Sequence, residues 1–359
     1  MLPNYDFAIK PRFYMLVGIS GSGKSFMANQ LKEMYKDNII ICSSDSIRAE
    51  LWGDENDQQN PQKVFQILHK RVKKALKKKL NVIYDATNLS RKRRISFLQE
   101  LNKIYCYKTC IIIATPFNEC IENNSRRKRK VPVDVIKRQR ESFQCPYFYE
   151  GWDSIGIINS NENYKVKELE SYIEELKLIP HDNPHHEYTI GNHIKEAQRY
   201  CENKQQSFIK DFSNYLVENS HQEITKILNF EKEIDDWYWA TMVARYHDIG
   251  KGLTKQFKNM KGEKVDVAHY YNHQNVSAYE LISRFRANEI LKEDVPKNCD
   301  DYYKSNDANW LMTAVLVNLH MEPFFKPYGS KSWKKLYDLI GERLADILIK
   351  FHEADLNSH

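Results

Sequence analysis

Residues 18–25 constrain this chain more than any other segment does. Their sequence, GISGSGKS, fits the pattern GxxxxGK[ST], follows an apolar run and precedes an amphipathic one. In this pattern the glycines let backbone N–H groups surround phosphate oxygens at the start of a helix, the lysine reaches the β- and γ-phosphates, and the last hydroxyl binds Mg²⁺. We therefore predict a strand, a phosphate-binding loop and a helix from about Lys24 to Tyr35, with ATP or another nucleoside triphosphate and Mg²⁺ as ligands. The expected contact residues are Gly18, Ser20, Gly21, Ser22, Gly23, Lys24 and Ser25.

Short apolar runs recur through the first half of the chain. They cover residues 13–17, 39–42, 82–84, 110–114 and 155–158, and each ends at a polar or glycine-containing loop. Alternation of such runs with amphipathic stretches is typical of βαβ units. It predicts an α/β fold in which helices cover both faces of a parallel sheet and ligands bind at the carboxyl ends of the strands.

The sequence pattern changes after Asn159. A polar stretch leads into a helical segment at 166–178 and then to Pro180 and Pro184, beyond which strand-like runs disappear. Long helical patterns follow at residues 194–216, 237–247, 276–287, 310–320 and 332–354. We expect a P-loop α/β domain at 1–165, a linker helix at 166–180 and a nearly all-α domain at 181–359.

Length and composition are those of a globular chain. Its 359 residues are enough for two domain cores. Hydrophobic residues make up 42% of the chain, and no apolar run approaches the roughly 18 residues that a membrane span requires. The N-terminal residues lack the features of a secretory signal, and the seven cysteines include no CxxC pair. We expect a soluble cytoplasmic protein with reduced thiols and no membrane partner, and the oligomeric state stays open.

Basic residues are clustered although the net charge is only +6. Residues 70–79 hold seven of them, residues 91–94 four and residues 126–130 five. Such clusters are compatible with an acidic partner such as a nucleic acid or a nucleotide. For the first cluster, a solvated helix face is the favoured interpretation.

Two carboxylates follow the second and third apolar runs. Asp45, in SSDSIR, is placed to accept a proton from an attacking hydroxyl, while Arg48, one helical turn later, can bind a substrate phosphate. A helix N-cap at Ser44 or Asp45 is the structural alternative, and it is compatible with catalysis. Asp85, in YDATNLS, can hold the Mg²⁺ shell or position the substrate, and its structural alternative is a turn residue.

Arginines in NNSRRKRKVPVDVI suggest a lid over the nucleotide. Arg126, Arg127 and Arg129 lie where a helical lid could neutralise charge that develops on the transferred phosphoryl group. We expect one of them to do so, and the others to contact nucleic acid or water.

These segments together resemble a known kinase family. GISGSGKS, SSDSIR, YDATNLSRKRR and RRKRKVPVDVI, in this order, are similar to elements of the kinase domain of bacteriophage polynucleotide kinases, and the resemblance covers roughly residues 12–159. It implies phosphorylation of a polynucleotide 5′-hydroxyl. It also implies that Asp45 activates this hydroxyl, that Arg48 binds the 3′-phosphate of the acceptor, and that a lid arginine, Arg126 or Arg127, contacts the ATP phosphates.

Histidines and aspartates recur through the second half of the chain. The neighbouring His247 and Asp248, at a helix end, can reach one cation, and His193 and Asp355 on other helices can complete a mixed nitrogen and oxygen ligand set. A divalent metal held in this way activates water and polarises a phosphoryl oxygen, which favours phosphate-ester hydrolysis.

The order of these residues resembles the HD phosphohydrolase superfamily. YTIGNHIKEA, YHDIGKG and HEADLNS match its H…HD…D elements, and histidines in YYNHQNVSAYE and LVNLHMEP match those of dinuclear members. The resemblance implies one or two divalent metals, from Mn²⁺, Co²⁺, Ni²⁺, Fe²⁺ or Mg²⁺. It assigns the first to His193, His247, Asp248 and Asp355, and the second to His273 and His320, with Lys251 as a ligand of the substrate phosphate.

Other histidines and aromatic residues have ordinary explanations. Because His269 and His273 are four residues apart and would share a helix face, His269 is the first substitute for His273. We expect no metal-binding role for His185, His186 or His352. The aromatic residues near the HD pair are expected to pack in the core rather than to stack on bases; they are Trp237, Tyr238, Trp239 and Tyr246.

The pairing of the two domains predicts nucleic-acid end healing. A broken RNA, such as a tRNA, or DNA with a 5′-hydroxyl and a 3′-phosphate or 2′,3′-cyclic phosphate would gain one phosphate and lose the other, ready for a ligase. Two other functions stay open. A small-molecule or nucleoside kinase joined to an HD nucleotidase would act on mononucleotides. An NTP-gated nucleic-acid sensor would keep its function after Asp45→Ala, whereas a kinase would lose phosphoryl transfer and retain ATP binding.

Overall fold

The computed structural model describes residues 10–158 except 56 and 58, 166–184, 187–219, 223–284, 290–292 and 306–358. The chain separates into two compact units. Described residues 10–139, 146–158 and 290–292 belong to the first, and the remaining described residues belong to the second. Within the described part of the chain, none of the helices has the length and apolar composition needed to cross a bilayer. The six cysteines placed by the structure are buried thiols.

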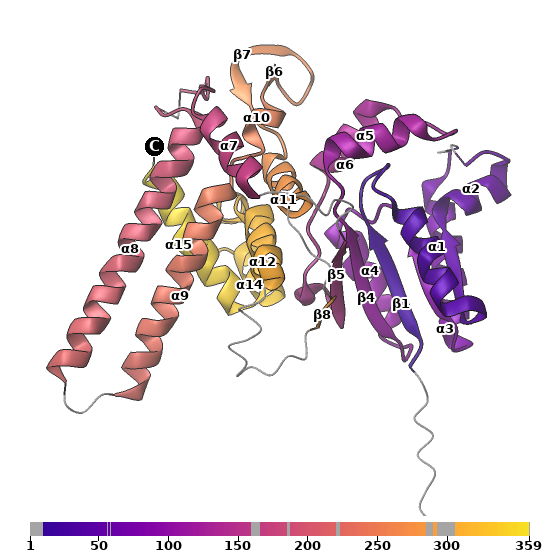
Figure 1. Cartoon of the computed structure of the whole chain (residues 1–359), viewed down its shortest axis with the longest axis horizontal. Helices are drawn as coiled ribbons and strands as arrows, with labels where there is room; N and C mark the ends of the chain where they lie inside the picture. The colour runs from indigo at the N-terminus through magenta and orange to yellow at the C-terminus, as the bar shows by residue number, and fades with distance from the viewer. Residues whose placement is uncertain are drawn as a thin grey trace, which may run out of the picture. The chain divides into compact units, whose positions relative to one another are not determined.

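A six-stranded sheet forms the centre of the first unit (Figure 1). Its strand order is β2-β3-β1-β4-β5-β8, all parallel except for β8, which pairs antiparallel with β5. Each apolar run predicted as a strand forms one. The strands are β1 (Arg12–Val17), β2 (Ile39–Ser43), β3 (Asn81–Asp85), β4 (Tyr107–Ile113), β5 (Ser154–Ile158) and β8 (Ile290–Lys292).

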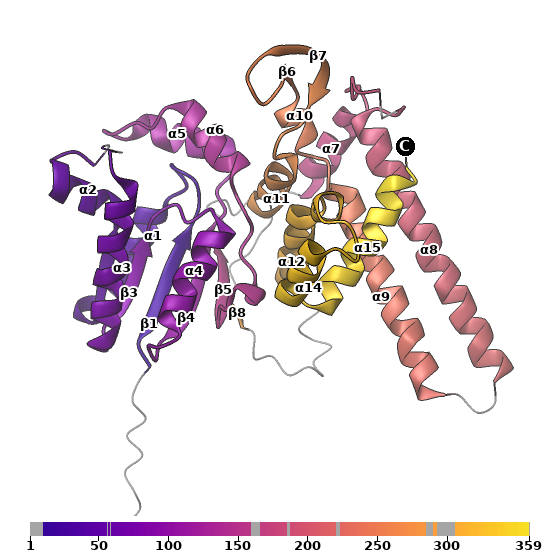
Figure 2. The same ribbon diagram turned by 180° about the vertical axis from the view of Figure 1, so that it is seen from behind.

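Both faces of this sheet are buried, as the continuous apolar runs predict. On one face Tyr14 and Leu16 of β1 pack in a cluster with Ala28 of helix α1. On the other, Phe13 contacts the ring of Phe97 in helix α4. The helices of this unit, seen from both sides in Figures 1 and 2, are α1 (Lys24–Tyr35), α2 (Ser44–Trp52), α3 (Pro61–Lys77), α4 (Arg91–Leu101), α5 (Phe117–Arg126) and most of α6 (Val133–Glu141), with the short turns η1 (Lys36–Asn38) and η2 (Phe148–Glu150).

Helices dominate the second unit, as predicted. They are α7 (Val166–Leu176), α8 (Ile190–Glu218), α9 (Ile224–Tyr246), α10 (Lys251–Thr254), α11 (His273–Ser283), α12 (Asn306–Leu319), α13 (Glu322–Phe325), α14 (Lys331–Ile340) and α15 (Glu342–Leu356). The antiparallel pair α8 and α9 extends well beyond the other helices (Figure 1). Thr189 caps α8 by accepting a hydrogen bond from the backbone N–H of Asn192.

Local predictions failed at two places in the second unit. The single helix expected over 332–354 is two helices, because Gly341 has a φ of 85°, in the left-handed region that ends a helix. A β-hairpin of β6 (Gln256–Lys258) and β7 (Lys264–His269) interrupts the helical region. Consequently His269 ends a strand while His273 begins α11, and the prediction that both share one helix face was wrong.

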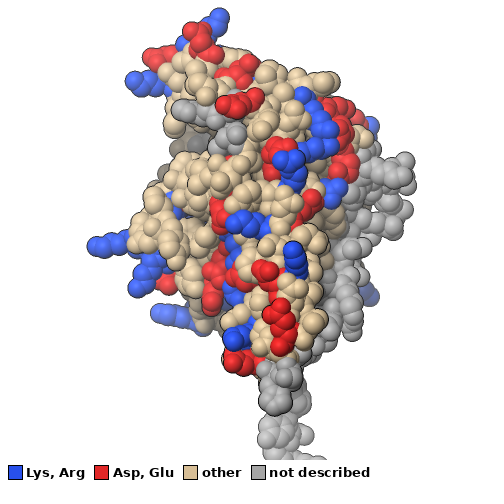
Figure 3. Space-filling model, turned by 90° about the vertical axis from the view of Figure 1, so that its left-hand side faces the viewer, with Lys and Arg blue, Asp and Glu red and all other residues tan. Residues whose placement is uncertain are grey.

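Charges on the α8 side of the second unit are mixed. Figure 3 shows lysine and arginine side chains interspersed with aspartate and glutamate on this face. Ion pairs also join α9 to α15, including Lys232 with Asp346 at 2.6 Å and Arg343 with Asp235 at 2.8 Å. Neighbouring charges of opposite sign cancel one another's field, so this face does not form a basic track for a polyanion.

Candidate phosphate-binding and metal-binding sites

The loop between β1 and α1 has the backbone that phosphate binding requires. Gly21 and Gly23 have φ values of 85° and 95°, which favour glycine. A Cβ atom on Gly21 would lie 2.1 Å from the carbonyl oxygen of Cys120, so a side chain there would also collide with α5. The Thr115 hydroxyl donates to the carbonyl of Ser22 at 2.8 Å. The loop is therefore shaped by its own glycines and by the loop and helix that follow β4.

Lys24 lies at the first position of α1. Its ammonium donates to the carbonyl of Ile19 at 2.7 Å, so the side chain folds back over the loop. Burial lowers the pKa of Lys24, and the carboxylate of Asp85 opposes this shift. The ammonium therefore lies where an anion in the loop would replace the carbonyl as its partner.

Ser25 and Asp85 bring two oxygen ligands together. Asp85 ends β3, and the Ser25 hydroxyl donates to its Oδ2 at 3.2 Å. Burial raises the pKa of Asp85, while Lys24 opposes the rise. A hydroxyl and a carboxylate are hard oxygen ligands of the kind that Mg²⁺ prefers. Asp85 is buried in this contact, which favours the Mg²⁺ prediction over that of a turn residue.

Asp45 has no capping role. Ser43 is the N-cap of α2, where its hydroxyl accepts hydrogen bonds from the backbone N–H groups of Asp45 and Ser46. The structural alternative, a cap at Ser44 or Asp45, therefore missed the observed cap by one or two positions. The Asp45 carboxylate instead receives Arg48 at 2.7 Å on Oδ1 and Arg129 at 2.7 Å on Oδ2.

The basic run after α5 is divided by a short loop. The side chain of Asn124 accepts from the backbone N–H of Val131 at 2.9 Å and donates to its carbonyl at 2.8 Å, which closes residues 127–130 into a loop after α5. Arg126 is 75% exposed and approaches Glu122 at 3.6 Å on its own helix. The structure does not bring Arg126 to the phosphate loop.

Arg129 reaches the proposed nucleotide site, whereas Arg127 is exposed. Burial is the main cause of the lowered pKa of Lys24, and the positive charge of Arg127 adds a smaller lowering effect. Arg129 contacts Asp45 directly, and only 18% of its side chain is exposed. Arg129 was expected only as one of three lid arginines, and the resemblance to the kinase family left the choice between Arg126 and Arg127. Helix α5 ends at Arg126 and the backbone of Arg127 is extended, so the three arginines do not share one helix face.

The basic cluster at 91–94 is partly structural. Arg94 forms a bidentate ion pair with Glu150, at 2.8 and 2.6 Å, and the two side chains are 1% and 0% exposed. Arg94 also donates to the carbonyl of Asn88 at 2.8 Å, and Trp152 donates to Glu150 at 3.0 Å. Arg94 therefore links α4 to Asn88 and to Glu150 of η2, and it is not accessible to an acidic partner.

The first predicted metal set is assembled in the second unit. Ligand atoms of His193, His247 and Asp355 all lie within 4.8 Å of one another in buried surroundings. His193 Nε2 lies 3.0 Å from Asp355 Oδ1 and 3.2 Å from His247 Nε2. Asp248 Oδ2 lies 3.2 Å from His247 Nε2. Residues from α8, from α15 and from the turn that follows α9 therefore meet at one point.

The second predicted metal set lies beside the first. Asp248, His273 and His320 form a buried group within the same 4.8 Å limit. His273 Nε2 lies 3.3 Å from Asp248 Oδ1 and 3.2 Å from His320 Nε2. Since Asp248 has one oxygen toward each group, it can bridge two cations.

Histidine tautomers favour cation binding at both groups. The Nδ1 atoms of His193, His247, His273 and His320 each face a backbone carbonyl, at 2.7 to 3.1 Å. A carbonyl only accepts, so each neutral ring carries its proton on Nδ1 and directs an Nε2 lone pair inward. Lone pairs that face one another at 3.2 Å repel, and either a metal cation or a proton between the rings removes the repulsion. Burial lowers the pKa of His247, but the carboxylates of Asp248 and Asp355 outweigh it and raise this pKa, so a proton can take that place when no metal is bound. Carbonyl support at Nδ1 is common for metal-binding histidines.

The charges of these groups agree with such a site. Burial lowers the pKa of His273 to about 4 and that of His320 to about 3, so both rings are neutral ligands at pH 7. Burial would raise the pKa of Asp248, but His247 and Lys251 hold it well below its usual range. Neither oxygen of Asp248 receives a hydrogen bond of normal geometry, although the Lys251 ammonium lies 2.7 Å from Oδ2 as an ion pair. A buried carboxylate in this state fits a divalent cation.

His181 is a site residue that our sequence analysis missed. It is 2% exposed, and its Nε2 lies 3.3 Å from the Lys251 ammonium. Its Nδ1 lies 2.7 Å from the carbonyl of Tyr188, so Nε2 is the acceptor for Lys251. No local signal separated His181 from the neighbouring His185 and His186, which lie outside the described residues. His352 packs against Phe324, as expected of a histidine without a ligand role.

The aromatic residues near the HD pair mostly belong to the core. Trp237, Trp239 and Tyr246 are 2–3% exposed, which confirms the packing prediction for them, whereas Tyr238 is 42% exposed.

A family model described as an AAA domain matches residues 13–146. The chain is 25% identical over 245 residues to an L-seryl-tRNA(Sec) kinase of Methanococcus maripaludis, and the alignment covers 61% of this chain and 93% of that kinase. A solved chain of the Pnkp1/Rnl/Hen1 RNA repair complex is 24% identical with a TM-score of 0.33; the match covers 38% of this chain and 44% of that chain. A gluconokinase from Sinorhizobium meliloti 1021 is 16% identical with a TM-score of 0.30, and the match covers 42% of this chain and 85% of that chain.

The first unit is a P-loop kinase-type domain. The family match covers the phosphate loop, Asp45, Asp85 and the lid arginines, and the similar curated protein is a kinase. A parallel sheet with helices on both faces agrees with this fold. A domain of this kind implies ATP or another nucleoside triphosphate and Mg²⁺ as ligands, and a phosphotransferase as the class of enzyme.

Proposed function

We propose that this chain is a bifunctional end-healing enzyme. The first unit would phosphorylate 5′-hydroxyl ends of a polynucleotide with ATP, and the second would remove a 3′-phosphate or a 2′,3′-cyclic phosphate with a divalent metal. The observation that carries the kinase half is the carboxylate of Asp45, held by Arg48 and Arg129 at 2.7 Å each, at the same edge of the sheet as the phosphate loop. A phosphate-binding loop alone does not provide a proton acceptor for a hydroxyl, and Asp45 does.

Phosphoryl transfer follows from the positions of these side chains. Asp45 accepts the proton of the attacking hydroxyl as the oxygen bonds to the γ-phosphorus and the bond to ADP breaks. Lys24 neutralises the transferred group from the phosphate loop, and Ser25 with Asp85 would hold Mg²⁺. Arg127 and Arg129 lie on the lid, where they stabilise negative charge at the transition state. Arg48 can turn from Asp45 to the phosphate that follows the acceptor nucleotide.

The second unit supports a phosphohydrolase of the HD type. Four histidines and two aspartates offer two adjoining ligand sets, which Asp248 joins. Divalent metals bound there would supply an activated water and polarise the phosphoryl oxygens. Lys251 holds a positive charge 2.7 Å from Asp248, at the edge of both sets, where it can bind a substrate phosphate. His181 accepts from Lys251 and fixes its direction.

A kinase of a hydroxyl carried on tRNA is a second candidate for the first unit. The similarity to the L-seryl-tRNA(Sec) kinase covers 93% of that protein, which favours an RNA-borne acceptor of this kind. The two candidates differ in the acceptor, because one phosphorylates the 5′ end of a strand and the other phosphorylates serine attached to a tRNA.

One experiment tests both units. Labelled RNA and DNA with a 5′-hydroxyl and a 3′-phosphate are incubated with ATP, Mg²⁺ and Mn²⁺, and both ends are followed. The end-healing proposal expects a new 5′-phosphate that Asp45→Ala abolishes, and a loss of 3′-phosphate that His247→Ala with Asp248→Ala abolishes. Seryl-tRNA and a set of nucleosides serve as competing acceptors. Transfer to seryl-tRNA or to a nucleoside without transfer to the strand would replace the proposed acceptor of the first unit. No release of 3′-phosphate would refute the proposed phosphohydrolase activity of the second unit.

A further inference from the structure

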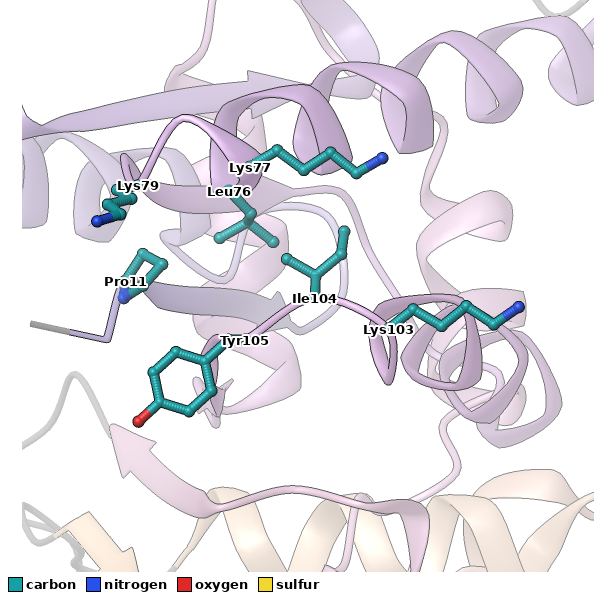
Figure 4. A pocket seen from close by; sticks show the side chains of 7 residues that line it. All are labelled: Pro11, Leu76, Lys77, Lys79, Lys103, Ile104 and Tyr105. Carbon is teal, nitrogen blue, oxygen red and sulfur yellow. The ribbon is translucent and has the colours of Figure 1, made fainter. Parts of the chain in front are cut away.

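The first unit has a cavity far from its phosphate loop. Figure 4 shows its lining at the edge of the sheet where β1 and β4 begin. Pro11 immediately precedes β1, and Tyr105 lies two residues before the start of β4. Because β1 has 6 residues and rises ~3.3 Å per residue, the cavity lies roughly 20 Å from the loop at the other end of that strand. It is thus separate from the nucleotide site.

The walls of this cavity combine apolar groups with positive charge. Leu76, Ile104 and Pro11 form an apolar centre, and the lining includes three lysines and no acidic residue. In Figure 4, Lys79 extends on the same side of the cavity as Tyr105, while Lys77 and Lys103 extend on the other. Within the described chain, none of the three lysines forms an ion pair. The volume, about 250 Å³, fits a nucleobase-sized planar group rather than a whole triphosphate.

Tyr105 offers a stacking surface at the mouth of the cavity. Its side chain is exposed, with 72% of the residue accessible to solvent. The ammonium of Lys10 lies 4.9 Å from the centre of its ring. Exposed aromatic rings flanked by cations are the usual contacts of single-stranded nucleic acids, because bases stack on the ring and phosphates pair with the cations.

The backbone at Lys79 supports a ligand-binding role. Lys79 follows α3 with a φ of 61°, and its N–H donates to the carbonyl of Leu76 at 2.9 Å. Glycine or asparagine is common at this position of a helix end, whereas a lysine there costs about 1 kcal/mol. Lys36 shares the positive φ, at 51°, but does not line this cavity. Lys36 can therefore serve as a control for Lys79, because it is a lysine with positive φ outside this cavity.

We propose that this cavity binds a nucleobase and its phosphate, as part of a single-stranded polynucleotide or as a free nucleotide. The base would lie among Leu76, Ile104 and Tyr105, with Lys79 on the phosphate at the Tyr105 side and Lys103 on the neighbouring phosphate of a strand at the other side. This site does not depend on the end-healing proposal, since its residues take no part in either reaction.

The test uses the full chain and ligands that neither unit can alter. A labelled oligothymidylate with a 5′-phosphate and a 3′-hydroxyl is titrated by fluorescence anisotropy over a range of salt concentrations, and thymidine 5′-monophosphate is titrated by calorimetry. The variants are Lys79→Gly with Lys103→Ala, Tyr105→Ala, and the control Lys36→Gly. Lys79→Gly relieves the backbone strain, so a merely structural role predicts equal or higher stability and unchanged binding.

We expect the lysine variant to bind the oligonucleotide about tenfold more weakly, with the salt slope reduced by about two, and Tyr105→Ala to lose a similar factor. The thermal midpoints should not fall. If the variants weaken binding of the strand alone, the ligand is a polynucleotide; if they also weaken binding of the monophosphate, the site takes free nucleotides. Binding equal to that of Lys36→Gly in both titrations, or no binding by the unmodified chain, would overturn the assignment.

Discussion

Replacing Asp45 with asparagine tests the kinase chemistry with little change in shape. The Asp45 carboxylate accepts Arg48 on one oxygen and Arg129 on the other, each at 2.7 Å. The amide keeps one acceptor oxygen, but it cannot take the proton of a hydroxyl and it places an NH₂ group against a guanidinium. Loss of a general base lowers rates by about 10² to 10⁴, so the barrier should rise by about 3 to 5 kcal/mol.

ATP binding should change far less than the rate. The direct contacts of the phosphate loop run through Lys24, Ser25 and Asp85, and none of their hydrogen bonds involves Asp45. We therefore expect kcat to fall while the ATP dissociation constant moves by no more than about threefold. Single-turnover transfer of labelled γ-phosphate to a 5′-hydroxyl oligonucleotide measures the rate of transfer. Competition with a fluorescent nucleotide measures the ATP dissociation constant.

Glu55→Gln is the matched control for this change. Its carboxylate lies 3.6 Å from the same nitrogen of Arg129 and is 47% exposed, but it does not contact Arg48. Removing this charge perturbs the lid without removing the proposed base, so the loss in kcat should stay below about threefold. A loss of less than about fivefold in Asp45→Asn, or an equal loss in both variants, would refute the assignment of Asp45 as the base.

Three other changes test the remaining assignments. Arg129→Gln should lower kcat by about 10² or more, whereas Arg126→Gln should lower it by less than about threefold; steady-state kinetics that reverse this order would contradict the lid geometry. Asp248→Asn removes the carboxylate shared by both ligand groups, so the Mn²⁺ content after dialysis should fall sharply from that of the unmodified chain. Plasma mass spectrometry measures this content, and an unchanged value would exclude Asp248 as a shared ligand. Glu150→Gln breaks a fully buried ion pair with Arg94 and should lower the unfolding free energy by about 3 to 5 kcal/mol in urea titrations. Glu50→Gln, in the exposed pair with Arg71, should lower it by less than about 1 kcal/mol. Equal losses in the two variants would show that burial does not determine how much each ion pair stabilises the fold.

The local sequence determined the elements of the first unit. The phosphate loop is contiguous, its glycines specify their own backbone, and the predicted helix from Lys24 to Tyr35 has the observed bounds. Apolar runs buried on both faces are strands regardless of their neighbours, which is why each one was found. A nearly all-α second unit was predictable for the same reason, since helical periodicity is a local property.

Only the tertiary structure decided which charged residues meet. Arg129 reaches Asp45 across 84 positions of sequence, and His181 reaches Lys251 across 70. Neither contact has a local signal, because the turn after Arg126 and the packing around α10 set the direction of each side chain. The β6–β7 hairpin was missed for a related reason: its strands are short and expose most of their side chains, so they lack an apolar pattern.

The phosphate loop shows both kinds of determination in one place. The sequence by itself specified a glycine turn followed by a lysine and a hydroxyl, because the required backbone angles belong to those residues. Folding added Asp85 from β3, Asp45 from α2 and Arg129 from the lid, which a parallel sheet brings to one edge because its strands all end there. The order of residues thus determined the phosphate-binding element, and the sheet decided which carboxylates and cations stand around it.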